Sequence, residues 1–138
     1  TITLKVKERP APANASNSKS SFEIANNIYS GLSDDQEHFC VMFLDSVNNI
    51  TGFKVLFTGG MNAATVDLKV VFRNALLFGA CSIIVVHNHP SNSLIASKED
   101  IQITQEIKQA GKLLGIRLLD HIILTNNSYL SMADEAMI

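Results

Sequence analysis

Two histidines separated by one residue follow a continuous apolar run at residues 83–86. In an extended chain, residues i and i+2 point to the same side, so the imidazoles of His87 and His89 can reach a common point. Pro90 comes next and turns the segment into a loop, because proline has no N–H to donate to a β-ladder. This spacing makes the two histidines candidate ligands of one metal ion.

An aspartate near the start of the next predicted helix is a candidate third ligand. Positions 100, 103, 107, 110 and 114 share one helical face and read Asp, Ile, Ile, Ala and Leu, so Asp100 points toward the apolar interior. A buried carboxylate needs a cation or several hydrogen-bond donors to offset its lost hydration. Since a strand and its following helix pack together, His87, His89 and Asp100 should meet. Three protein ligands leave a fourth position for water, which is typical of a catalytic zinc site.

Each of these residues also has a simpler interpretation. An isolated His-x-His is more often part of an ordinary polar loop, and Ser97 with Asp100 matches a helix capping box, which would be compatible with catalysis. Taken jointly, H-x-H-P, six residues and S-x-x-D fix the residue at five positions. A chance match is rare, on the order of one chain in tens of thousands from average composition. The joint pattern therefore favours the metal site.

The elements that position these residues alternate between helix and strand. Apolar residues at helical spacing predict helices over 22–29, 67–78 and 97–114, with Asp67 as an N-cap and Gly115 as a terminator. Apolar runs between turn residues predict a hairpin of strands over 38–44 and 50–58, then strands over 81–86 and 116–125, and a short piece near Tyr129. The order predicts an α/β fold, a mixed β-sheet with flanking helices.

Residues 1–20 are predicted to be a flexible N-terminal arm or linker, and residues 21–138 a single domain. The arm alternates apolar and polar residues over 2–7 and then becomes rich in Pro, Ala, Asn and Ser. The alternating part could add a strand to the sheet of a second copy of the chain, so the sequence allows a homo-oligomer.

Composition narrows the classes of function. With 46% hydrophobic residues and a formal net charge of -2, the chain is not intrinsically disordered. Eleven scattered basic residues and no tryptophan argue against direct nucleic-acid binding. No apolar run reaches the roughly 18 residues of a spanning helix, and no signal-peptide core is present. Cys40 and Cys81 lie in apolar runs and are predicted to be buried free thiols, so we expect a cytoplasmic protein without membrane contact.

The motif residues and their surroundings resemble a known family. His87 to Pro90, with Ser97 and Asp100, resemble the JAMM (MPN+) metalloprotease motif. The surrounding sequence, residues 22–138, resembles the RadC-like branch of that superfamily through the segments EHFCVMFLD, VVHNHPS and LDHIIL. The resemblance implies a JAB/MPN fold, related to the cytidine-deaminase-like architecture. It also implies one zinc ion held by His87, His89 and Asp100, a catalytic glutamate at Glu37 and a serine, Ser97, beside the metal.

The predicted function is therefore that of a zinc-dependent hydrolase, a metallopeptidase acting on an amide bond of a peptide or protein substrate. Glu37 would take a proton from water and pass it to the leaving amine, and Ser97 would donate a hydrogen bond to the oxyanion. A RadC-type, DNA-repair-associated module without peptidase activity is the alternative, and a catalytically silent scaffold also stays open. A zinc deaminase is disfavoured, because the H-x-E and P-C-x-x-C elements are absent.

Several neighbouring polar residues have competing interpretations. On the residues alone Glu37 reads as a surface carboxylate, and the resemblance selects it over other acids, namely Asp35, Asp45 and Asp67. His38 is predicted to be a packed or capping side chain, and His121 to be structural or to support the site from behind. Asn92 stands where the family usually has glycine, and asparagine tolerates the left-handed backbone needed there.

Overall fold

The computed structural model describes residues 13–60 and 65–138. The elements follow the chain in the order α1 (Ser18–Tyr29), β1 (His38–Leu44), β2 (Ile50–Thr58), α2 (Leu68–Leu77), β3 (Ser82–Asn88), α3 (Lys98–Leu114), β4 (Arg117–Leu124) and β5 (Tyr129–Ser131). One sheet contains all five strands in the order β2-β1-β3-β4-β5. Strands β3 and β4 are parallel and joined through α3, whereas the other neighbours are antiparallel. The predicted mixed sheet is confirmed.

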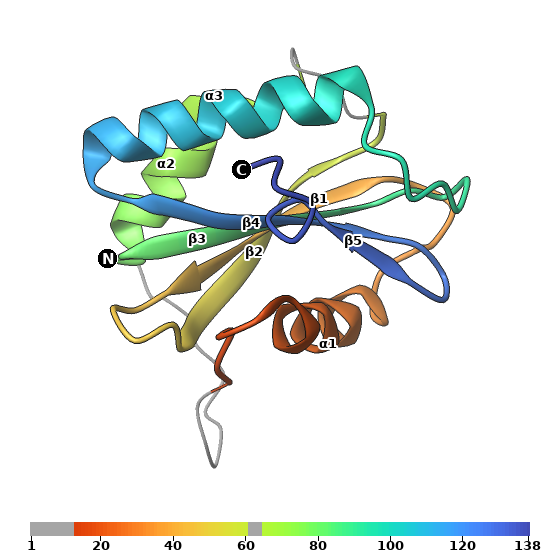
Figure 1. The fold of residues 1–138 in the computed structure, drawn as a ribbon, viewed down its shortest axis with the longest axis horizontal. Helices are drawn as coiled ribbons and strands as arrows, with labels where there is room; N and C mark the ends of the chain where they lie inside the picture. The colour runs from red at the N-terminus through yellow and green to blue at the C-terminus, as the bar shows by residue number, and fades with distance from the viewer. Residues whose placement is uncertain (1–12, 61–64) are drawn as a thin grey trace.

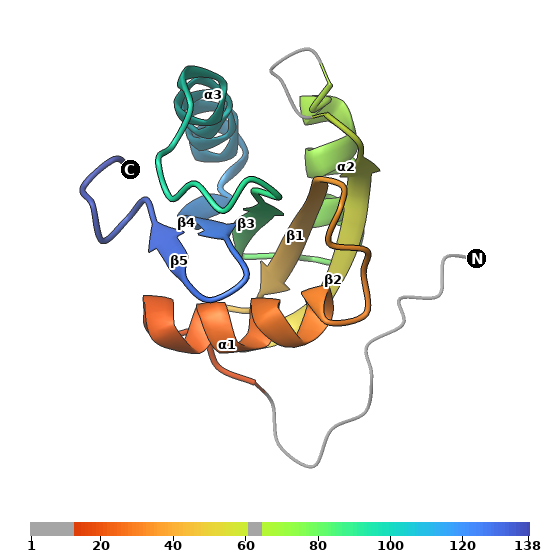
Figure 2. The same ribbon diagram turned by 90° about the vertical axis from the view of Figure 1, so that its right-hand side faces the viewer.

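Helices cover both faces of the sheet, with α2 and α3 on one face and α1 on the other (Figures 1 and 2). Successive residues of β1 enter the two cores alternately: Phe39, Val41 and Phe43 pack on the α2/α3 side, and Cys40, Met42 and Leu44 pack on the α1 side. Burial on both faces explains why β1 reads as a continuous apolar run. In β3, Ile83 and Val85 enter the α2/α3 core, and His87 continues that series.

An irregularity in the β3–β4 pairing decides which way the second half of β4 faces. Ile83 pairs with Leu118 and Ile84 with Asp120, so Leu119 is an extra residue on β4. One extra residue exchanges the faces of every residue after it. As a result Ile122 packs in the α1-side core, and His121 points toward α3.

The ends of α3 are set by local chemistry that the sequence predicted. Ser97 is the N-cap, and Gly115 ends the helix at a φ of 72°, a left-handed conformation that glycine adopts without strain. Gly111 is required by a close approach, because a Cβ there would lie 2.2 Å from the carbonyl oxygen of Ile116. The chain can therefore turn back directly against α3 and enter β4.

Three features differ from the sequence prediction. Strand β3 runs to Asn88 and not to residue 86, so His87 lies inside the strand and not beyond its end. Helix α1 starts at Ser18 and not at residue 22, because the Asn17 side chain accepts the Ser20 N–H at 2.8 Å and caps an earlier turn. Cys81 is exposed, so its predicted burial is wrong: it lies in the turn before β3, whereas Cys40 lies inside β1 and is buried. Residues 1–12 of the predicted arm lie outside the described residues. None of the helices in the described ranges combines the length and hydropathy needed to cross a bilayer.

Candidate metal centre

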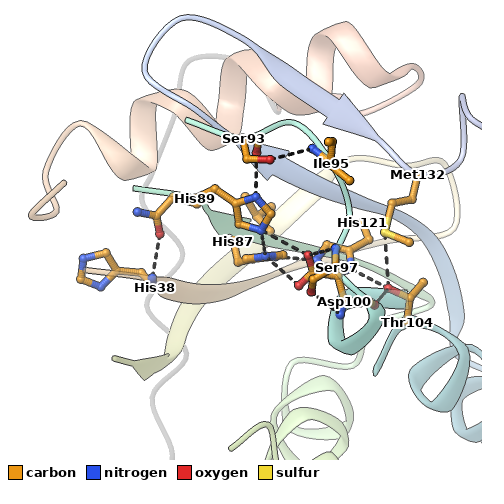
Figure 3. A network of polar contacts seen from close by, with 12 residues as sticks. His38, His87, His89, Ser93, Ile95, Ser97, Asp100, Thr104, His121 and Met132 are labelled. Carbon is orange, nitrogen blue, oxygen red and sulfur yellow. Dashed lines mark hydrogen bonds and ion pairs between the residues drawn. The ribbon is translucent and has the colours of Figure 1, made fainter. Parts of the chain in front are cut away.

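The end of β3 and the start of α3 bring three predicted ligands together, and Figure 3 shows their side chains pointing toward one another. The Nε2 atoms of His87 and His89 lie 2.9 Å apart. Oδ1 of Asp100 lies 3.0 Å from Nε2 of His87, and Oδ2 lies 3.2 Å from Nε2 of His89. His87 and Asp100 are buried, and His89 is half-buried. This group could hold a metal ion.

The spacing and the donor types fit a single divalent ion. A tetrahedral zinc ion with bonds of about 2.0–2.1 Å separates its ligand atoms by about 3.3 Å. The two Nε2 atoms lie near that spacing, at 2.9 Å, and one ligand atom from each of the three residues lies within 4.8 Å of the others. Nδ1 of His89 lies 2.7 Å from the carbonyl oxygen of Ser93. Because a carbonyl only accepts, Nδ1 carries the hydrogen, and the lone pair of a neutral His89 is on Nε2, facing the cluster.

The electrostatics of the cluster favour an ionised carboxylate. Burial opposes the charge of Asp100, but hydrogen bonds with His87 and His89 outweigh it and hold the pKa of Asp100 below its ordinary value. The hydrogen bond with Asp100 raises the pKa of His89, and the nearby charge of Glu37 acts in the same direction. Asp100 is thus kept in the form that a metal ligand requires.

Asp100 also caps the helix that carries it. Its Oδ2 accepts the Ser97 N–H at 2.8 Å, and Ser97 Oγ accepts the Asp100 N–H at 3.0 Å. The predicted capping box is therefore present, and it fixes the Asp100 carboxylate on the side that faces the histidines. Capping and metal binding use the same side chain.

Behind His87 lies a line of fully buried polar groups. Nδ1 of His87 is 2.7 Å from Nε2 of His121, and Nδ1 of His121 is 2.6 Å from Thr104 Oγ1. Thr104 in turn donates its hydroxyl hydrogen to the backbone carbonyl of Asp100 at 2.6 Å. Burial lowers the pKa of His121 well below its ordinary value, and the charge of the neighbouring His87 acts in the same direction. His121 thus lies behind a predicted ligand and not in the cluster itself.

Glu37 directly precedes β1 at the sheet edge where β3 ends. It lines a cavity of about 460 Å³ together with Asp35, Pro90 and Ser91, the last two from the loop that follows His89. The Glu37 carbonyl accepts the Gly59 N–H at 2.9 Å, which ties this segment to the end of β2. Glu37 and the cluster therefore lie at the same end of the sheet, where β1 begins and β3 ends.

The remaining candidates have other partners. Asp45 accepts two backbone N–H groups in the turn between β1 and β2, and Asp67 caps α2. The ring of His38 contacts Ser33 and Thr58, which matches its predicted packing role. None of these side chains belongs to the three-residue cluster found within the described ranges.

Two contributors were missed in the sequence. Thr104 lies four residues after Asp100, so a polar residue one turn further on the buried face was the available signal. Ser93 acts through its backbone carbonyl, which any residue could supply, so its side chain carries no signal. Asn92, by contrast, adopts the left-handed conformation that was expected, at a φ of 63°.

Comparison with known proteins identifies similar chains. Residues 15–137 match the family model described as the RadC-like JAB domain. A UPF0758 protein of Methanosarcina acetivorans is 43% identical over 103 residues, covering 75% of this chain and 45% of the relative. A UPF0758 protein of Carboxydothermus hydrogenoformans is 44% identical over 102 residues, covering 74% of this chain and 45% of the relative. This chain thus spans about half the length of the curated relatives it matches.

Proposed function

Because this chain is a member of the RadC-like JAB domain family, we propose that it is a zinc-dependent hydrolase, a metallopeptidase that cleaves an amide bond in a peptide or protein. The observation that carries the proposal is the convergence of His87, His89 and Asp100 within 3.2 Å of their neighbours. Three protein ligands leave one coordination position open, which suits catalysis more than a purely structural role.

The donor set favours zinc over harder ions. Magnesium and calcium prefer oxygen ligands, whereas imidazole nitrogens with one carboxylate suit zinc. When bound, the ion would lower the pKa of water to about 7 and polarise the substrate carbonyl. His87, His89 and Asp100 would hold it at the end of β3, beside the cavity that Glu37 lines.

Glu37 is the proposed general base. It would take a proton from the attacking water and later give it to the leaving amine. Its support is its position in the cavity beside Pro90 and the action of its charge on His89. Both observations support a role for the Glu37 carboxylate beside the predicted ligands.

Ser97 is the proposed donor to the oxyanion that forms at the carbonyl. Its oxygen accepts the Asp100 N–H, and in the described part of the chain no acceptor takes its hydroxyl hydrogen. The start of a helix also favours developing negative charge. Loss of such a donor typically slows turnover by about 10²–10³-fold.

Peptide cleavage by zinc-loaded protein tests this function, with a matched pair of variants. Glu37→Gln should retain zinc and lose cleavage by about 10²–10⁴-fold, since general-base catalysis contributes that much. Asp35→Asn removes a carboxylate from the same cavity and should cleave like the wild type. Cleavage of a peptide library is followed by mass spectrometry. Unchanged cleavage by Glu37→Gln would exclude Glu37 as the base, and an inactive zinc-loaded wild type would favour the alternative.

That alternative is a DNA-repair-associated module without peptidase activity. One observation favours it: Lys108, Lys112 and Arg117 line one cavity of about 620 Å³ at the far end of α3 from Asp100. Phosphate contacts by such side chains make DNA binding fall steeply with salt. A steep salt dependence that is lost in Lys108→Glu/Lys112→Glu would support the module, and binding that is weak and insensitive to salt would exclude it.

A further inference from the structure

Three hydrogen bonds connect the side chain of one predicted ligand to the backbone of another. They run from His87 to His121, from His121 to Thr104, and from Thr104 to the Asp100 carbonyl, over 2.7, 2.6 and 2.6 Å (Figure 3). We call these four groups the His121 relay. His87, Thr104 and His121 are almost fully buried, so water does not compete for these hydrogen bonds.

The direction of the relay follows from hydrogen counting. A carbonyl oxygen only accepts, and threonine has one hydroxyl hydrogen, so Thr104 donates to Asp100 and its own oxygen accepts from Nδ1–H of His121. A neutral imidazole carries one N–H, which leaves Nε2 of His121 as the acceptor of the Nδ1–H of His87. The reverse direction would leave two oxygens, those of Thr104 and the Asp100 carbonyl, 2.6 Å apart with no hydrogen between them.

We propose that His121 and Thr104 are positioning residues that fix the hydrogen of His87 on Nδ1 and thereby aim its Nε2 lone pair at the metal. The inference rests on the metal site of the proposed function, and it does not require peptidase activity. Imidazole tautomers at metal sites are set by the partner of the nitrogen that does not bind the ion. Ser93 performs this task for His89 through its carbonyl, and the relay performs it for His87.

Asp100 takes part at both ends of this arrangement. Its carboxylate faces His87 and His89, and its carbonyl terminates the relay. Helix α3 therefore sets the third ligand and the tautomer of the first ligand together. The relay also depends on the extra residue Leu119, because without it His121 would point to the opposite face of the sheet.

Variants at Thr104 test the relay through zinc affinity, measured by competition with a chromogenic chelator. Thr104→Val keeps the shape and removes the hydroxyl, and it should weaken zinc binding by about 10–100-fold. Thr104→Ser keeps the hydroxyl and should bind like the wild type. Ile107→Val trims a buried residue of the same helix outside the relay and should also leave affinity unchanged. Wild-type affinity in Thr104→Val, or equal losses in Thr104→Ser and Thr104→Val, would overturn the proposal.

Nitrogen NMR of the histidine rings provides a readout that needs no variant. The chain has only four histidines, so each ring can be assigned. In metal-free wild-type protein, above the ordinary histidine pKa, His121 should carry its hydrogen on Nδ1, and hydrogen on Nε2 would overturn the relay. Zinc binding without peptide cleavage would remove the proposed hydrolase and leave this inference intact. Failure of the wild type to bind zinc would remove both.

Discussion

Two buried aspartates, Asp100 and Asp120, lie on neighbouring elements and have opposite surroundings. The carboxylate of Asp120 accepts the backbone N–H groups of His121 and Ala133 and the hydroxyl of Ser131. All of its partners are donors that the chain itself supplies. These hydrogen bonds fasten β5 and the segment after it to β4, so Asp120 has a structural role.

Asp100 instead faces the Nε2 atoms of His87 and His89. With hydrogen on Nδ1 of each ring, these Nε2 atoms are acceptors like the carboxylate, and one cation could bind all three groups. The pKa values of the two aspartates also differ. Burial raises the pKa of Asp120, whereas a histidine ring of the metal-free protein that also carries hydrogen on Nε2 donates to Asp100 and holds the pKa of Asp100 below its ordinary value. The chemistry of the partners, and not burial of a carboxylate, distinguishes a metal site from a structural one.

The largest expected difference between the two aspartates is in zinc affinity. Asp100→Asn removes a charged ligand and should weaken zinc binding by more than about 100-fold, since even partners behind a ligand contribute about 10–100-fold. Asp120→Asn should bind zinc like the wild type. Isothermal titration with zinc measures both variants. Equal affinities would show that Asp100 is no more a ligand than Asp120.

For the stability of the metal-free protein, the larger effect is expected at Asp120 and the smaller one at Asp100. Asp120→Ala leaves two buried donors and one part-buried donor without an acceptor and should lower the free energy of unfolding by about 3 kcal/mol. At a pH where His87 and His89 are neutral and donate nothing to Asp100, Asp100→Ala removes the acceptor of the Ser97 N–H and should cost about 1 kcal/mol, the usual value of a helix cap. Urea denaturation with chelator present gives both values. A larger loss for Asp100→Ala would contradict the comparison.

A smaller effect is expected in the pH dependence of stability. Since the pKa of Asp120 is raised in the folded state, the folded chain holds its proton at pH values where the unfolded chain has lost it. This contribution to stability is complete below the ordinary pKa of 3.8 and is lost as the pH rises through the folded value. Asp120→Asn should remove that component. Urea denaturation across this range measures it, and parallel curves for wild type and variant would contradict the assignment.

The sequence predicted the fold where local pattern and burial agree. Strands β1 and β2 have the predicted bounds, because apolar runs and turn residues mark them clearly. The convergence of His87, His89 and Asp100 was also predictable, since the i, i+2 spacing and the helical face each point one way.

Features that depend on pairing between strands were not predictable. The orientation of His121 follows from the extra residue Leu119, and the exposure of Cys81 follows from where β3 begins. Neither leaves a periodic signal in the sequence. The relay through Thr104 likewise exists only once β4 packs against α3.

Metal analysis of protein purified without chelators tests the central claim most directly. The account predicts about one zinc ion per wild-type chain, bound through three protein ligands, with the metal lost in His89→Ala and kept in Asp120→Asn. A wild type without metal, or His89→Ala with a full equivalent of zinc, would contradict it.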